Sequence, residues 1–463
     1  MFKYYTSKIY KNSPLLFQNA IVTAKGFVYN KIKQGRKFHL LQRELLKNER
    51  LSSDELRSLQ LSELKRLINY AYEYIPFYKK LFDKLRFHPG NLKKIEDIKE
   101  LPILEKKIIK EHYNEFIPSN IQRKFFLKGE SSGTTGSPLS LYMNRELVES
   151  EHAFVMRQYR WAGCSWKSRT ASFRGDIIVP VEQKTPPFWR YDAYKKVLLF
   201  STYHISESTI DVYLDQLHKF DPEFIYGYSS CLFLIAKYAK RYNYEIRLRS
   251  LRAIGTSSET LYEHQKSLIE RTFKVRIFDW YGQFERVIFI GTCEFGNCHI
   301  FPDYGVTEFM PVSGADGKEY YELIGTGFNN KIMPLIRYRT NDIVTLTDGP
   351  CKCGRNFLRI NAVLGRTNDA IVTPEGRIIG MIDSVFNDIE HISVAQVYQK
   401  SLNELVILVV SEPGFNISDE KKIISNIKLR IGNQMKVTVN RVDHIPRLPS
   451  GKFKLILSDF QNL

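Results

Sequence analysis

The sequence predicts an α/β fold: a large N-terminal α/β domain with parallel strands and a helical N-terminal region, a β-rich subdomain, and a small α+β C-terminal domain. From about residue 125, short apolar runs alternate with segments that are amphipathic at helical spacing. This alternation is typical of a parallel sheet whose strands are joined by helices. The 463 residues are 43% hydrophobic, with 26 Gly and 18 Pro, which excludes a disordered or collagen-like chain.

The first 50 residues carry half of the net positive charge of the chain. They hold 11 Lys or Arg and 2 Asp or Glu, a net charge of +9, against +18 for all 463 residues. Such a segment is either a solvated basic arm or a surface that docks on an anionic membrane or partner. Nucleic acid is not an expected partner, because the sequence holds no zinc-finger, RNP-like or helix-turn-helix spacing.

The best candidate for a membrane span is residues 14–30, and Gln18, Lys25 and Gly26 interrupt it. No stretch reaches the ~18 uncharged apolar residues that a span needs. The segment also lacks the small-residue cleavage site of a secretory signal. Six cysteines in a chain of this length do not make a disulfide framework. We therefore expect a cytoplasmic protein, with peripheral contact at the inner membrane face through residues 1–50 as the docking alternative.

Residues 40–117 predict helices, because leucines recur at spacings of three and four with charged residues between them. A helix start is indicated at Ser52–Glu55. Further on, alternating strands and helices are expected. The strands are centred on residues 171–173, 196–200, 224–226, 251–254 and 274–278, and the helices span 210–220, 231–242 and 263–273.

The residue pattern changes in the last third of the chain. Residues 319–347 and 356–372 predict β-strands, with turn signals before and between them. The tail then predicts a strand at 405–411, a helix at 420–432 and a strand at 436–442. We expect three parts: residues 1–117 with the basic arm and helical region, a core over 118–368, and a small C-terminal domain over 369–463.

The loop with the sharpest chemical signal is Ser131-Ser132-Gly133-Thr134-Thr135-Gly136-Ser-Pro138. Its glycines let the backbone turn tightly around an anion, and its hydroxyl groups can donate to phosphate oxygens. It is not a Walker loop, because no Gly-Lys-Ser/Thr follows. Taken alone, it is more often a plain loop.

Four further motifs follow in a fixed order. They are Tyr281-Gly282-Gln-Phe284-Glu285, Tyr338-Arg-Thr-Asn-Asp342, Gly365-Arg366-Thr-Asn-Asp369 and Pro446-Arg-Leu-Pro-Ser-Gly-Lys452. Together with the Ser131–Pro138 loop they resemble the adenylate-forming superfamily of acyl-CoA synthetases, luciferases and peptide-synthetase adenylation domains. The likeness is greatest to the phenylacetate–CoA ligase branch and its CapK-type members, and it covers roughly residues 60–463.

This resemblance implies ATP and Mg²⁺ as ligands and assigns roles to the motif residues. The Ser131–Pro138 loop wraps the ATP phosphates, and Glu285 holds Mg²⁺, a hard cation that prefers carboxylate oxygen. Asp342 accepts hydrogen bonds from the ribose hydroxyls. Lys452 bridges the substrate carboxylate and the α-phosphate. The remaining nucleotide-site residues implied by the family pattern are Ser257, Ser258, Glu259, Tyr281, Gly282 and Arg366, and Asp369 is the hinge about which the small domain swings.

Two positions depart from the family pattern. Phe284 replaces the usual Thr or Ser before the acidic residue, which removes one hydroxyl contact to the adenylate. Asn341 replaces a glycine, a mild change because Asn tolerates the left-handed conformation. The plainer alternatives are that Glu285 and Asp342 form surface ion pairs and that Lys452 is a solvated lysine.

A second constellation points to a metal. Cys293, His299, Cys351 and Cys353 offer three thiolates and one imidazole, a ligand set that suits a closed structural zinc site. The alternative is a set of reduced cysteines beside a satisfied histidine. Some phenylacetate–CoA ligases carry zinc on a similar pattern, so the resemblance favours zinc. Cys298 adjoins His299 and would face the opposite way on a strand.

In this branch the acyl pocket is lined by aromatic residues, which implies Tyr226, Tyr228, Trp280 and Phe284 here, although each suits a core equally well. The leading hypothesis is ATP-dependent activation of a small carboxylic acid as an acyl-adenylate, followed by transfer to coenzyme A. One alternative is a ligase of capsule or O-antigen biosynthesis that transfers the acyl group to a sugar-linked acceptor without coenzyme A. Another is a non-catalytic scaffold that keeps the fold.

Overall fold

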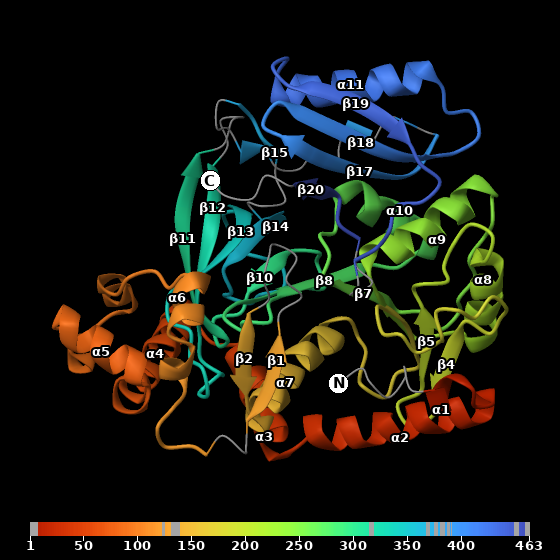
Figure 1. Ribbon diagram of the computed structural model, residues 1–463. Coiled ribbons are helices and arrows are strands. Elements are labelled where there is room, and N and C mark those ends of the chain that lie inside the picture. Colours follow the sequence, from red (N-terminus) through yellow and green to blue (C-terminus); the bar gives the residue numbers. More distant parts are fainter. Residues whose placement is uncertain are drawn as a thin grey trace.

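Twelve strands form one continuous mixed sheet at the centre of the chain (Figure 1). The computed structural model describes residues 8–122, 126–130, 139–313, 319–366, 371–374, 378–379, 385–386, 389, 391–448 and 453–458. The strand order is β11-β12-β13-β14-β10-β9-β8-β7-β6-β3-β5-β4. The five strands from β8 to β5 are parallel, and the remaining pairs are antiparallel. The predicted α/β class is confirmed, and the β-rich part shares one sheet with the parallel part.

The strands of this sheet are β3 (Thr170–Arg174), β4 (Trp189–Asp192), β5 (Val197–Ser201), β6 (Phe224–Gly227), β7 (Ala253–Ser257), β8 (Ile277–Gly282), β9 (Phe289–Thr292), β10 (Cys298–Ile300), β11 (Gly305–Ser313), β12 (Glu319–Gly327), β13 (Tyr338–Leu346) and β14 (Arg359–Arg366). Two small hairpins are β1 (Leu127–Glu130) with β2 (Ser140–Met143), and β15 (Ile371–Val372) with β16 (Ile378–Ile379).

The helices are α1 (Lys8–Lys11), α2 (Leu15–Lys33), α3 (Arg36–Asn48), α4 (Ser53–Tyr74), α5 (Pro76–Leu85), α6 (Lys106–Glu111), α7 (Arg145–Trp161), α8 (Ile210–Phe220), α9 (Ser229–Arg241), α10 (Glu263–Phe273) and α11 (Ile417–Ile431). Three short 3-10 helices lie at Pro89–Asn91, Ile95–Glu100 and Tyr113–Phe116.

The helix start expected at Ser52 is confirmed by a reciprocal cap on α4. Ser52 Oγ accepts the backbone N–H of Glu55 at 3.3 Å, and the Glu55 carboxylate accepts the backbone N–H of Ser52 at 2.8 Å. This arrangement satisfies two otherwise unpaired donors at the helix start. The apolar face of α4 then packs into a core with the antiparallel half of the sheet, through residues such as Leu64 and Ile68.

The basic N-terminal segment is not a solvated arm over its described residues. α2 lies against β4, an outer strand of the sheet, and side chains of α2 bind the backbone of that edge. Asn19 Oδ1 accepts from the N–H of Tyr191 at 3.0 Å, and Thr23 Oγ1 accepts from the N–H of Ala193 at 3.1 Å. A Cβ on Gly26 would lie 1.9 Å from an Asp192 oxygen, so α2 approaches the strand as closely as glycine allows.

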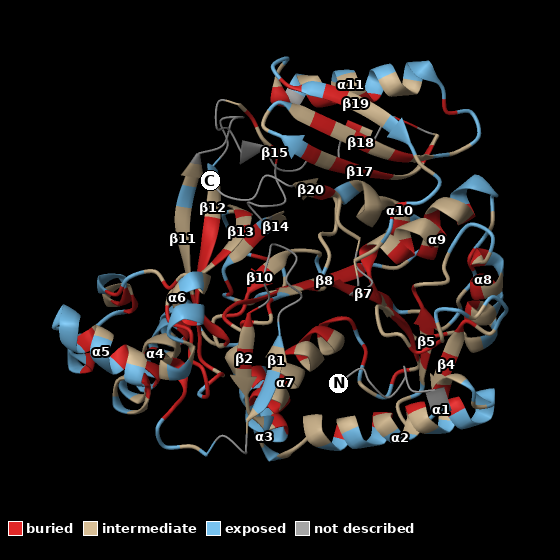
Figure 2. Ribbon diagram, in the orientation of Figure 1, coloured by how far each residue is buried: buried red, intermediate tan, exposed pale blue. Residues whose placement is uncertain are grey.

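The C-terminal part forms a second, smaller layer above the large sheet (Figure 1). Its sheet has the order β19-β18-β17-β20, built from β17 (Ile392–Ser401), β18 (Glu404–Ser411), β19 (Lys436–Arg441) and β20 (Ile456–Ser458), with α11 packed on it. Each layer has its own buried core, visible as the red strands of Figure 2. Among the described residues, no helix combines the length and apolar character that a membrane crossing needs.

Candidate functional site

A cleft lies where the carboxyl ends of β7 and β8 meet the C-terminal part of the chain. In parallel sheets, ligands bind at this end of the strands. Five predicted nucleotide-site residues line the cleft, namely Ser258, Glu259, Tyr281, Gly282 and Asp342. Leu448 and Phe453–Ile456 line it from the C-terminal side.

Asp342 is held in place by a side chain of β8, a strand of the same sheet that is not adjacent to β13. It lies on β13, is 5% exposed, and its Oδ2 accepts the Tyr281 hydroxyl of β8 at 2.5 Å. The side chain of Gln283 donates in turn to that hydroxyl. Asn341, just before Asp342, has φ 60°, which is the left-handed conformation that this position was expected to need. A fixed, buried carboxylate at a cleft wall is a suitable acceptor for sugar hydroxyls. The backbone of Arg366 pairs with Asp342 across β13 and β14.

Glu285 is buried next to the start of β13. The described residues give its carboxylate one hydrogen bond, from the Tyr338 hydroxyl to Oε1 at 3.4 Å. This weak contact leaves oxygen lone pairs for a hard cation, so the donor chemistry suits Mg²⁺. Arg286 follows in the left-handed conformation at φ 59° and pairs with Glu151 of α7.

Glu259 joins the two parts of the chain. Its carboxylate accepts the backbone N–H of Ser230 at 3.0 Å, at the first turn of α9, and the backbone N–H of Phe453 at 2.7 Å. Arg447 approaches the same carboxylate at 3.8 Å and donates to Ser230 Oγ at 2.8 Å. A second ion pair, between Lys237 of α9 and Glu412, measures 2.9 Å. These contacts hold the C-terminal part over the cleft.

Three predicted acyl-pocket aromatics gather around a cation that the sequence interpretation did not include. Arg174, the last residue of β3, places its guanidinium 4.8 Å from the Tyr226 ring and 4.7 Å from the Tyr228 ring. It also donates to Ser257 Oγ at 3.1 Å. Trp280 stacks on Tyr226 at 4.9 Å. A lone arginine at the end of a short strand carries no sequence signal of its own.

The fourth predicted pocket residue, Phe284, lies beside the β1–β2 hairpin. A Cβ on Gly129 of β1 would lie 2.7 Å from the Phe284 ring. Phe284 therefore packs at the base of the segment that leads into Ser131, and β2 resumes at Ser140.

Several predicted residues lie outside the described ranges. These are Ser131, Ser132, Gly133, Thr134, Thr135 and Gly136 of the loop, the hinge residue Asp369, and Lys452. The described residues on both sides of the Lys452 turn, Leu448 and Phe453, line the cleft.

Asp279 on β8 is a half-buried cleft carboxylate that the sequence interpretation did not include. Its Oδ1 accepts the Thr256 hydroxyl at 2.6 Å. Burial away from water raises the pKa of this carboxyl group to about 7, because the charged form loses its hydration.

The predicted metal ligands come together. The ligand atoms of Cys293, His299, Cys351 and Cys353 all lie within 4.8 Å of one another. The Sγ atoms of Cys293 and Cys351 are 3.7 Å apart, and Cys353 Sγ is 3.4 Å from His299 Nε2. Tetrahedral zinc with bonds of about 2.3 Å to sulfur and about 2.0 Å to nitrogen sets such pairs about 3.5–3.8 Å apart. A disulfide would need about 2.05 Å. The geometry and chemistry of the four donors therefore suit zinc.

The surroundings of these four residues, here called the Cys/His cluster, suit thiolates. Backbone N–H groups of Phe295 and Cys353 point at Cys293 Sγ and Cys351 Sγ at 3.4 and 3.5 Å. Asn297 adds a side-chain donor to Cys351 Sγ at 3.2 Å. His299 Nδ1 lies 3.1 Å from the carbonyl of Phe357, which favours a proton on Nδ1 and leaves Nε2 as an acceptor.

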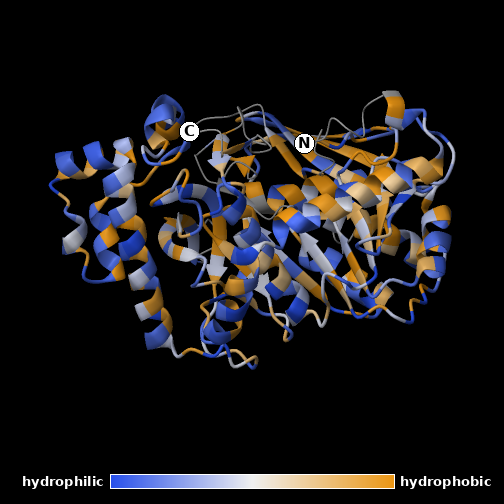
Figure 3. Cartoon of the chain, turned by 90° about the horizontal axis from the view of Figure 1, so that it is seen from below, coloured by the Kyte–Doolittle hydropathy of each residue, from blue (hydrophilic) through white to orange (hydrophobic). Residues whose placement is uncertain are grey.

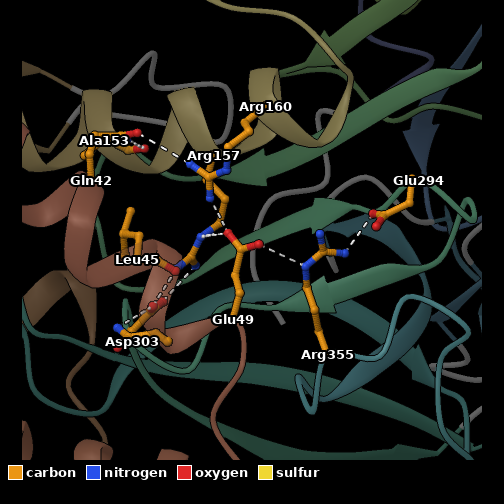
Figure 4. A network of polar contacts seen from close by, with 10 residues as sticks. Gln42, Leu45, Glu49, Ala153, Arg157, Arg160, Glu294, Asp303 and Arg355 are labelled. Atoms are coloured by element: carbon orange, nitrogen blue, oxygen red, sulfur yellow. Dashed lines mark hydrogen bonds and ion pairs between the residues drawn. The ribbon is translucent and has the colours of Figure 1, made fainter.

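A buried ion-pair network connects the Cys/His cluster to the N-terminal helices (Figure 4). Arg157 of α7 is fully buried, and its guanidinium binds Asp303 at 2.9 and 2.6 Å. Glu49, after α3, binds Arg157 at 3.3 Å and Arg355 at 3.2 Å. Arg355 follows the Cys351–Cys353 turn. The same ion-pair network therefore contacts α3, α7 and that turn.

β10 separates the Cys/His cluster from the cleft. His299 faces the cluster, whereas Cys298 lines the cleft, with its Sγ 3.7 Å from the Thr292 hydroxyl. The expectation that Cys298 faces away from His299 is confirmed.

Comparisons with known proteins find relatives that match nearly the whole chain. Residues 371–459 match the CapK C-terminal domain. The chain is 27% identical to protein CapK of Staphylococcus aureus, over 98% of this chain and 99% of that protein. It is 25% identical to a phenylacetate-coenzyme A ligase of Thermus thermophilus, over 88% of this chain and 98% of the ligase.

The fold resembles a solved 2-hydroxyisobutyryl-CoA ligase. In its postadenylation state, in complex with 2-HIB-AMP, that ligase gives a TM-score of 0.69 at 17% identity, covering 89% of this chain and 92% of the ligase. In its thioesterification state, with 2-HIB-AMP and CoA, it gives a TM-score of 0.55 over 89% and 91%.

Proposed function

Because this chain is a relative of CapK and of the phenylacetate-coenzyme A ligases, within the adenylate-forming superfamily, we propose that it activates a carboxylic acid with ATP. The acid attacks the α-phosphorus of ATP, an acyl-adenylate forms and pyrophosphate leaves. A nucleophile then takes the acyl group and AMP leaves. The observation that carries this proposal is the cleft in which Tyr281 fixes Asp342, facing a segment that continues into Lys452.

Each residue has a task that follows from its chemistry. Asp342 accepts from the ribose, and Glu285 holds Mg²⁺, which neutralises charge on the phosphates. The Ser131–Pro138 loop donates to phosphate oxygens, and Arg366 adds positive charge beside them. Lys452 offsets the repulsion between the attacking carboxylate and the α-phosphate.

The second half-reaction needs a different arrangement of the C-terminal part. We place its hinge at Asp369, between the core over 118–368 and the domain over 369–463. The bonds from Glu259 to Phe453 and from Lys237 to Glu412 hold the arrangement described here, and rotation has to break them.

The acid pocket combines aromatic surface with a fixed cation. Tyr226, Tyr228 and Trp280 favour a planar or apolar body, and Arg174 favours an acid that carries a second anionic or strongly polar group. We therefore propose an acid with two polar ends in preference to a plain aryl acetate.

Coenzyme A is the proposed acceptor, because the relatives at 25–26% identity include several phenylacetate-coenzyme A ligases. A sugar-linked acceptor in surface polysaccharide synthesis is the second candidate. The likeness to CapK, which extends over nearly the whole of both chains, favours it.

We further propose that the Cys/His cluster holds structural zinc, because the donor spacings suit tetrahedral coordination and four protein ligands leave no open position for substrate. Elemental analysis should give about one zinc per chain. Metal-free protein with an unchanged melting temperature would contradict it.

ATP–pyrophosphate exchange over a panel of acids tests the main proposal. The panel should pair each aryl or alkyl acid with an analogue that bears a second carboxylate or phosphate. Exchange that depends on the acid supports activation. No exchange with any acid, on folded protein replete with zinc and Mg²⁺, would favour a non-catalytic scaffold.

A further inference from the structure

The N-terminal helix α2 has its apolar and polar faces reversed. The buried face carries Gln18, Val22, Gly26 and Asn30, of which one is a large apolar residue. The exposed face carries Leu16, Phe17, Ala20, Ala24, Phe27 and Val28. At 3.6 residues per turn these six positions fall within an arc of about 120° on one side of the helix. A surface helix normally shows the opposite distribution.

The inward polar face has a structural reason. β4 is an outer strand, and its free edge has backbone groups that need partners. Asn19 and Thr23 supply them, as described above. Gln18 accepts from Arg190 of the same strand at 2.5 Å and donates to the carbonyls of Tyr10 and Ser13. The polar residues are therefore used inside the molecule.

No contact within the described residues explains the outward apolar face in the same way. Leu16 is 83% exposed, Phe17 51%, Val28 54% and Phe27 45%. α2 lies along the bottom of Figure 1 and so faces the viewer in Figure 3, where hydrophobic residues colour most of it. A contiguous apolar surface of this kind marks an interaction site.

The charge around this face identifies its partner. Exposed cations continue from the end of α2 along α3, at Lys31, Arg36, Arg43 and Lys47. Among the acids of this region, Glu182 is already paired with Lys11 at 2.8 Å. Asp176 interacts electrostatically with Lys25 and Lys33, and Glu44 is exposed on α3. Two copies of this chain meeting through α2 would bring two segments of charge +9 together. An anionic surface is attracted by the same charge.

We propose that α2 lies in the plane of an anionic lipid bilayer, with Leu16, Phe17, Phe27 and Val28 inserted among the acyl chains and the lysines and arginines at the headgroups. A helix with an apolar face and flanking basic residues binds membranes in this way, to a depth of about 5–10 Å. With 19 residues, the helix presents a line about 28 Å long. The proposal does not rest on the enzymatic function, and its test needs no substrate.

The test is flotation of the full chain with vesicles of phosphatidylcholine and phosphatidylglycerol, or of phosphatidylcholine alone. Wild type should float with the anionic vesicles at low salt. A Leu16→Ser/Phe27→Ser variant should partition at least about tenfold less, because each large side chain gains at least that factor on burial. Leu429→Ser, on α11 and 82% exposed in wild type, is the matched control and should float like wild type.

A second pair of measurements separates charge from insertion. Lys31→Glu/Arg36→Glu should lower binding to anionic vesicles about tenfold, and added salt should have the same effect. Phe27→Trp should show a blue shift in its fluorescence when anionic vesicles are added. The proposal is overturned if wild type ignores anionic vesicles at low salt. It is equally overturned if wild type is a dimer that Leu16→Ser/Phe27→Ser converts to a monomer.

Discussion

The two faces of β10 carry two sites of different construction. On one face, His299 joins three cysteines in a buried cluster that four side chains of the large domain complete. On the other, Cys298 lines an open cleft whose walls come from the segment after β7, from β8, β13 and β14, and from the C-terminal part. The cluster is tied to α3 and α7 by a buried ion-pair network, whereas the cleft is joined to the C-terminal part by a few bonds at Glu259 and Arg447.

Because of this difference, we expect the cluster on one face of the sheet to stabilise the fold and the cleft on the other face to carry out the reaction. A closed set of four donors can bind a metal and nothing else, so its loss should unfold the region without changing the reaction. An open cleft with walls from two parts can change shape during a cycle. Substitutions on the cluster face should therefore change the melting temperature, whereas substitutions on the cleft face should change the kinetics of the reaction.

The largest effect is expected at Lys452, which immediately precedes the cleft-lining residue Phe453 in the chain. Lys452→Ala should slow adenylation about 10²–10³-fold, the scale for losing one charge-stabilising donor. Transfer of the acyl group from synthetic acyl-adenylate should stay near the wild-type rate. Pyrophosphate exchange and single-turnover transfer measure the two steps, with Lys436→Ala, at an exposed lysine of β19 outside the cleft, as the control. An equal loss in both steps would show that the C-terminal part does not act in one step alone.

The next effect concerns the cluster face. Cys351→Ser should lose the zinc and lower the melting temperature by about 10 °C, because several kcal/mol of metal binding leave the folded state. Pyrophosphate exchange measured well below the melting temperature should be little changed. Cys298→Ser, on the opposite face of the same strand, is the matched control and should keep both the zinc and the melting temperature. If both serine variants behave alike, the separation by β10 is wrong.

On the cleft face, Tyr281→Phe should raise KM for ATP about tenfold and leave the melting temperature nearly unchanged. The hydroxyl holds Asp342 at 2.5 Å, and a hydrogen bond to a charged group is worth about 1.5–3 kcal/mol. Steady-state kinetics at saturating acid measure the change. A fall in kcat with KM unchanged would place Tyr281 outside the ribose site.

The smallest effect is a pH dependence at Asp279, whose pKa is raised to about 7 by burial. The unfolded chain releases this proton near pH 4, while the folded chain keeps it, so stability falls as pH rises from about 4 to 7. The side chain introduced by Asp279→Asn stays neutral, so this variant should lose roughly 2 kcal/mol less stability than wild type between pH 5 and pH 7. Urea unfolding at a series of pH values measures the two slopes, and parallel slopes would count against a buried neutral carboxyl group.

Periodicity predicted the elements whose polar residues face water. The spans expected for α8 and α10 agree with the structure residue for residue, and the start of α4 lies at the expected cap. Each has an apolar stripe on a polar helix, which is the pattern that sequence analysis detects.

Two helices that the sequence did not predict, α2 and α7, bury polar groups. α7 buries Glu149, Arg157 and Gln158, so it shows no simple apolar stripe, and α2 shows the stripe on its outer face. The ligands of the cluster were predictable because cysteine and histidine are rare and their spacing is informative. Arg174 was not, because its role depends on two tyrosines more than fifty residues away.

The contact between α2 and β4 also has a consequence for how the chain is made. Roughly 155 residues separate the end of α2 from the start of β4. At 5–20 residues per second, the ribosome needs roughly 8–30 s to deliver the strand after the helix. During that interval Asn19 and Thr23 have no strand to cover, and the apolar face of α2 has left the ribosome before β4 has been made. A surface that binds α2 during synthesis would therefore hold the nascent chain before its large sheet has formed.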